Sequence, residues 1–128
     1  MIEIVFRMRD WHHVDGTLDN TGASERVGGD EVLAASAGRL REVGWAAAAA
    51  HPRARPGWGW PPEDDELAVP LGRADWELVV QELRRWAEIT ALRADDAARD
   101  EAATQRRVAE LVRRHLDAEA SVGPATGP

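Results

Sequence analysis

The sequence predicts an α+β protein in which an N-terminal strand or hairpin and one helix precede a tryptophan- and proline-rich loop and an antiparallel two-helix hairpin. Ile2, Ile4, Phe6 and Met8 occupy every second position, which is the period of a half-buried strand. Four prolines fall within residues 52–66, where they interrupt regular structure. Residues 73–121 contain no glycine or proline, and their apolar side chains recur at the spacing of a helix face.

The N-terminal lobe is expected over residues 1–51. The dipeptide Asp15-Gly16 favours a tight turn, so we expect a short β-hairpin around it. Asp30 is expected to cap a helix that ends at Gly44 and has an apolar stripe of Leu33, Ala37, Leu40 and Val43. Residues 45–50 can form either a further helical turn or a short buried strand, and we favour the strand. We see no internal repeat.

The remaining chain is expected to form three parts of one domain: a connecting loop at 52–66, a helical hairpin lobe at 67–120 and a disordered tail at 121–128.

The helical lobe is expected to contain two helices rather than one long rod. The first lies near residues 73–90, and Leu71 and Trp76 have the spacing of a hydrophobic staple at its start. The apolar stripe weakens at residues 93–96, where an aspartate can cap a second helix. An antiparallel arrangement lets the two apolar stripes cover each other.

The composition limits the classes of function. The net charge of −7 argues against a protein that binds nucleic acid mainly through its overall field. The chain has no cysteine, which excludes disulfides and thiolate metal sites, and no apolar run of membrane-spanning length. We therefore expect a cytoplasmic protein with no membrane contact and no cofactor. All 16 basic residues are arginine, and alanine, glycine and proline are abundant, which predicts that the chain comes from a bacterium with a high-GC genome or from its phage.

One cluster has side chains suited to metal binding or acid–base chemistry: His12, His13, Asp15 and Asp19. Two imidazoles with carboxylates can hold zinc, or one histidine can act with an aspartate as a general base. In the expected hairpin, however, His12 lies opposite Asp19 as a cross-strand pair, and adjacent histidines point to opposite faces. We therefore favour the structural interpretation and keep the enzyme site as an alternative.

Tryptophan supplies six of the seven aromatic side chains, and it gives the candidate binding surface: Trp58, Trp60, Trp76 and Trp86. Trp58 and Trp60 lie in an extended proline-rich segment and point to the same side. They can anchor the loop to the core or form an open recognition patch, and we favour core anchoring.

A basic line on the last helix gives a third hypothesis, nucleic-acid binding through Arg106, Arg107, Arg113 and Arg114. Acidic residues outnumber arginines in that segment, so a solvated, salt-bridged face is the stronger interpretation. The function that we expect is a small non-enzymatic protein-interaction or regulatory subunit, a homodimer or other homo-oligomer, or bound to another protein.

Overall fold

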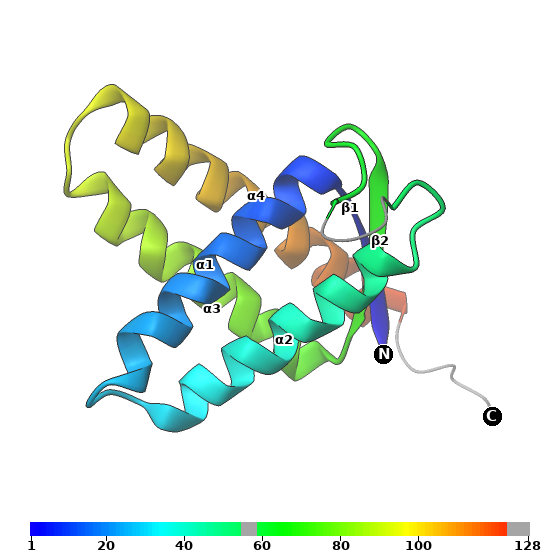
Figure 1. Cartoon of the computed structure of the whole chain (residues 1–128), viewed down its shortest axis with the longest axis horizontal. Coiled ribbons are helices and arrows are strands. Elements are labelled where there is room, and N and C mark those ends of the chain that lie inside the picture. Colours follow the sequence, from blue (N-terminus) through cyan, green and yellow to red (C-terminus); the bar gives the residue numbers. More distant parts are fainter. Residues whose placement is uncertain (55–58, 123–128) are drawn as a thin grey trace. The chain divides into compact units, whose positions relative to one another are not determined.

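A computed structural model of the chain describes residues 1–54 and 59–122. Within these residues two strands and four helices follow one another (Figure 1): β1 (Ile2–Arg7), α1 (Met8–Arg26), α2 (Glu31–Ala49), β2 (Glu66–Leu71), α3 (Arg73–Ala91) and α4 (Asp96–Val122). The expected α+β class is confirmed. Of the expected disordered tail, residues 121–122 belong to α4 and the remainder lies outside the described residues.

The chain divides into two compact units, which are described separately: Glu3–Leu71, and Gly72–Pro128 together with Met1–Ile2. The first unit contains a two-stranded sheet of β1 and β2. The strands are antiparallel, because the N–H of Met8 bonds to the carbonyl of Asp65 at 2.8 Å and that of Arg9 to Glu63 at 3.0 Å. Side chains alternate along both strands, and those on one face are buried: Ile4, Phe6, Leu67, Val69 and Leu71.

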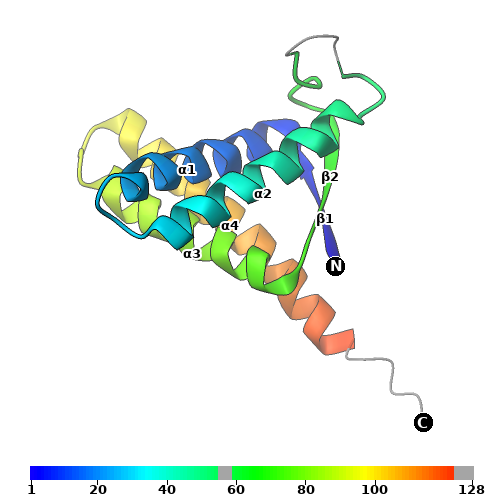
Figure 2. The ribbon, with the colours of Figure 1, turned by 60° about the horizontal axis from the view of Figure 1, so that its bottom comes forward.

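The helices of this first unit, α1 and α2, lie side by side and antiparallel, and the loop that follows α2 leads back to the sheet (Figure 2). Trp11 in the first turns of α1 is fully buried, and its ring meets Phe6 edge to face at 5.6 Å. Gly44 of α2 lies against the same indole, so closely that a Cβ at this position would overlap the ring. A glycine is therefore required for α2 to approach α1 at this level.

In the second unit, α3 and α4 form the expected antiparallel helical hairpin. Trp76 is fully buried, and its indole N–H donates to the carbonyl of Ile2 at 2.8 Å. The expected break between the helices is confirmed: Ala94 is left-handed, with a φ of 58°, and the Asp95 side chain accepts from the Ala98 N–H at 2.7 Å. Arg73 joins the helices by donating to the Leu116 carbonyl at 2.8 Å.

Several expectations for the N-terminal lobe are wrong. Asp15-Gly16 is not a hairpin turn, because both residues lie inside α1. The apolar side chains of α1, among them Trp11, Val14 and Leu18, recur at helical spacing and are buried. Burial of this stripe overrides the preference of Asp15-Gly16 for a turn. Asp30 caps α2 as expected, by accepting from the Leu33 N–H at 3.0 Å.

The predicted end of α2 is also wrong. The helix continues through Gly44 to Ala49, so residues 45–49 form the further helical turn that was the alternative, and the favoured strand is wrong. Residues 46–49 are all alanine, the residue with the highest helix propensity. Gly44 destabilises the helix locally, but it allows α2 to contact the Trp11 ring.

The order of elements corrects the expectation that the chain has no internal repeat. A strand, a helix and a second helix occur twice. Trp76 follows Trp11 by 65 residues, and the capping Asp95 follows Asp30 by the same 65. Each tryptophan is fully buried, and each aspartate bonds to the N–H three residues ahead. The described part of the chain therefore contains two β-α-α repeats, whose equivalent positions lie 65 residues apart.

The strand pairing agrees independently with this offset. The Met8 to Asp65 bond sets a register in which Ile4 lies opposite Val69. These two residues are also 65 positions apart, and both are fully buried. Buried helix positions match as well: Ala37 with Ala102, Leu40 with Gln105, and Gly44 with Ala109.

Candidate functional site

Asp15 and Asp19 lie one turn apart on α1 and share a cation from α2. Arg41 Nε donates to Asp15 at 3.0 Å, and its Nη1 donates to Asp19 at 2.8 Å. The hydrogen bond to Asp15 raises the pKa of the Arg41 guanidinium above its ordinary value, against the opposing effect of partial burial. The two carboxylates thus hold the helices together through one arginine.

Trp45 completes this cluster from the next turn of α2. Its indole N–H donates to Asp15 at 3.1 Å, and the Arg41 guanidinium carbon lies 4.9 Å from the ring centroid. The Trp45 side chain nevertheless remains 43% exposed. The result is a tryptophan at the surface with a fixed orientation, which we name the Trp45 cluster: Asp15, Asp19, Arg41 and Trp45.

The two histidines of the candidate metal site lie elsewhere on α1. His12 is half-buried, and its ring meets that of Trp60 at 5.0 Å, nearly edge to face. His13 is half-buried one position further along the helix. The expected pairing of His12 opposite Asp19 is wrong, because the segment is a helix rather than a hairpin. Within residues 1–54 and 59–122, no three histidine, aspartate or glutamate side chains form a group that could hold a metal ion.

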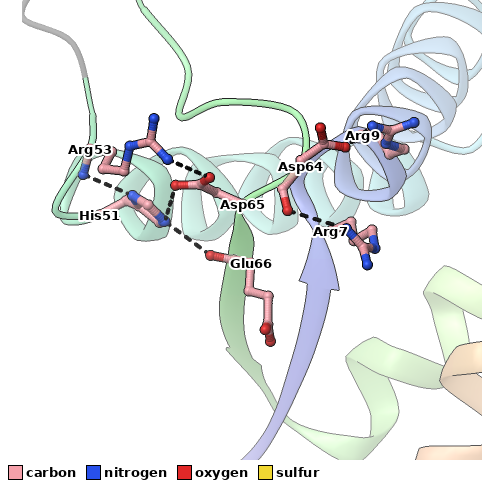
Figure 3. A network of polar contacts seen from close by, with 7 residues as sticks. All are labelled: Arg7, Arg9, His51, Arg53, Asp64, Asp65 and Glu66. Carbon is pink, nitrogen blue, oxygen red and sulfur yellow. Dashed lines mark hydrogen bonds and ion pairs between the residues drawn. The ribbon is translucent and has the colours of Figure 1, made fainter.

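The loop after α2 is tied together at its base (Figure 3). The Arg53 N–H donates to His51 Nδ1 at 3.0 Å, so the ring hydrogen is on Nε2, which lies 3.0 Å from the Glu66 carbonyl. Arg53 also donates to Asp65 at 2.9 Å, and Asp65 lies 3.8 Å from the same imidazole.

The other side of that base is held by two arginines of the chain's start. Arg9 pairs with Asp64, and Arg7 donates to the Asp64 carbonyl at 3.4 Å. These contacts join both ends of the loop to β1, α1 and β2. They satisfy backbone and side-chain groups within the loop, so the network is an anchor for the segment that carries Trp60.

The four tryptophans of the expected binding surface have different environments. Trp58 lies outside the described residues. Trp60 is half-buried against His12, and Trp86 is half-buried with the Arg85 guanidinium 5.3 Å from its ring centroid. Trp76 is fully buried, so it is a core residue and not an exposed contact.

The arginines of the expected basic line are also unequal. Arg113 pairs with Glu77 of α3 and lies 3.8 Å from Asp117. The Glu77 hydrogen bond raises the pKa of Arg113 and lowers that of Glu77. Arg106, Arg107 and Arg114 are exposed. Arg113 therefore joins α3 to α4 through an ion pair, and the four arginines do not form a uniform basic face.

No family model, curated protein or solved structure shows significant similarity to this chain. The described helices include none that is both long and apolar enough to span a membrane.

The sequence analysis named Asp15 and Asp19 as candidate site residues but missed Arg41 and Trp45, the other two members of the Trp45 cluster. Assigning residues 45–50 to a strand separated Trp45 from Arg41. In a continuous helix the two residues are four apart and lie on one face. That spacing, with the i,i+4 pair of Asp15 and Asp19, was the available signal, and it depended on assigning both segments to helices.

Proposed function

We propose that this chain is a small, non-enzymatic, cytoplasmic protein-interaction or regulatory subunit that associates with copies of itself or with another protein. The observation that carries this proposal is the surface position and fixed orientation of Trp45. Tryptophan and arginine are the residues that contribute most often to the energetic centres of protein interfaces.

The geometry lowers the cost of binding through this residue. Asp15 holds the indole N–H and Arg41 covers one face of the ring, while Asp15 and Asp19 fix the guanidinium. A side chain that is already ordered loses little rotamer entropy when a partner covers it, a saving of about 0.5–1.5 kcal/mol. The exposed part of the Trp45 ring is therefore favourable for contact with apolar protein surface.

Light scattering of the purified chain tests the proposal, beginning with self-association. We expect a mass above that of the monomer, and a shift toward the monomer in a Trp45→Ala variant. Leu92→Ala is the matched control, because Leu92 is an 82% exposed apolar residue at the α3–α4 turn. Circular dichroism checks that both variants keep their helix content.

A hetero-complex is the other form of the proposal. If the wild type is a monomer, purification of a tagged chain from its host should recover a defined partner that the Trp45→Ala variant fails to retain. A monodisperse monomer that recovers no partner, or association that Trp45→Ala leaves unchanged, would contradict the function through this surface.

A further inference from the structure

The second unit has an open groove along α3. Apolar atoms of Ala74 and Leu78 contribute to its lining, together with Gln81. Glu77, Arg84 and Arg113 supply charged groups around it. Val80 also lines the groove, and all seven residues belong to the unit formed by α3 and α4. The groove therefore combines an apolar surface with a paired carboxylate and guanidinium.

The internal repeat shows what covers the corresponding face in the first unit. The counterparts of Ala74 and Glu77, 65 positions earlier, are Arg9 and His12. There the loop after α2 lies over the helix: Trp60 contacts His12 at 5.0 Å between ring centroids, and Asp64 pairs with Arg9. In the first repeat this helix face is thus covered by a loop segment that contains a tryptophan.

The first unit also shows how a carboxylate–arginine pair of this protein holds an indole. Asp15 accepts the Trp45 N–H while Arg41, itself bonded to Asp15, lies over the ring. In the second unit the pair of Glu77 and Arg113 likewise joins two helices, and it lines the groove. This pair can offer an indole the same acceptor and the same cation.

We infer that the groove of Ala74, Glu77, Leu78, Gln81, Arg84 and Arg113 binds a tryptophan-bearing loop segment of a partner protein. The inference rests on the proposed function and names the chemistry of its partner. The indole contacts Ala74 and Leu78 through its apolar ring, and its N–H donates to Glu77.

Fluorescence polarisation of a labelled peptide tests the inference on the full chain. The probe has the sequence of residues 59–66, Gly-Trp-Pro-Pro-Glu-Asp-Asp-Glu, because that segment covers the equivalent face. We expect saturable binding, weakened at least about tenfold when alanine replaces the tryptophan of the peptide.

Two protein variants locate the binding site. Ala74→Glu places a longer, charged side chain in the groove at an exposed position in the first turn of α3, where an acid is compatible with the helix. It should weaken binding at least about tenfold. Ala103→Glu makes the same change at an exposed position of α4 that does not line the groove, and it should leave binding unchanged.

Three results would overturn the groove assignment: no binding to the wild type at millimolar peptide, equal binding of the peptide without tryptophan, or wild-type binding by Ala74→Glu. Binding that is lost in His12→Ala but kept in Ala74→Glu would assign the peptide to the first unit and also overturn it. Any of these results, combined with association that depends on Trp45, would leave the proposed function standing. Peptide binding to the groove without any association that depends on Trp45 would contradict only the role of Trp45 and would leave the groove assignment intact.

Discussion

At the scale of single residues, Trp11 and Trp76 occupy equivalent positions in the two repeats but make different contacts. Trp11 and Trp76 are both fully buried near the start of the first helix of their repeat. Trp76 donates to Ile2, whereas the indole N–H of Trp11 has no hydrogen-bond partner within residues 1–54 and 59–122. Trp11 is instead positioned by packing, against Phe6 and Gly44. Its environment therefore depends on shape more than on polar contacts.

That dependence gives opposite predictions for two glycines of α2. A Cβ added at Gly38 would point into open space, so Gly38→Ala should raise the free energy of unfolding by about 0.5–1 kcal/mol. Gly44→Ala gains the same propensity but forces a methyl group into the Trp11 ring. It should lower the free energy of unfolding, since overpacking costs about 1–3 kcal/mol. Urea denaturation compares the variants, and equal stabilisation by both would contradict the packing of α2 on Trp11.

At the scale of elements, the helix starts that have a side-chain cap could be predicted from the local sequence. Asp30 and Asp95 were predicted as possible caps from sequence, and both accept from an N–H three residues ahead. No comparable local signal contradicted the expected hairpin around Asp15-Gly16 or the expected strand at 45–50. Turn and strand preferences are weak there, and helix formation depended on burying the stripe that contains Val14 and Leu18.

The caps provide a test at this scale. Asp30→Ala and Asp95→Ala should each lower the free energy of unfolding by about 1 kcal/mol, because each leaves an N–H at a helix start without its acceptor. Asp100→Ala, at an exposed position within α4, serves as the control and should have a smaller effect. Thermal or urea unfolding gives the comparison. Costs no larger than that of the control would show that neither aspartate acts as a cap.

At the scale of the whole molecule, the two repeats have diverged in how their helices are joined. The first repeat uses Arg41 with two aspartates and Trp45, and the second uses Arg113 with Glu77. The position 65 residues after Trp45 is Glu110, and that after Asp15 is Val80. The repeats thus share their strand, buried tryptophan and cap, while their interhelical polar contacts differ.

The ion pair of Glu77 and Arg113 predicts how the stability of the protein changes at acidic pH. The Arg113 hydrogen bond lowers the pKa of Glu77 in the folded chain, below the unfolded value of about 4.3. The stabilising contribution is therefore complete above that value and is lost as the pH falls through the folded pKa. Glu77→Gln should destabilise the protein at pH 7, and its difference from the wild type should shrink on acidification.

Urea midpoints measured between pH 7 and acid check this sign. Glu88→Gln on the same helix serves as the control, since no ion pair with Glu88 occurs in the described part of the chain. A Glu77→Gln difference that stays constant over the whole pH range would show that the pair does not contribute to acid sensitivity.

The sequence by itself determined the α+β class, the strand at the N-terminus, the two C-terminal helices and their break, because alternation, helical stripes and aspartate caps act within a few residues. Only the tertiary structure decided that α1 replaces a hairpin, that α2 passes through Gly44, and that Trp76 is core while Trp45 is at the surface. The repeat was readable only in part, through the spacing of the Asp10-Trp11 and Asp75-Trp76 pairs. Its recognition depended on strand pairing and helix contacts between residues far apart in the chain, which no local preference encodes.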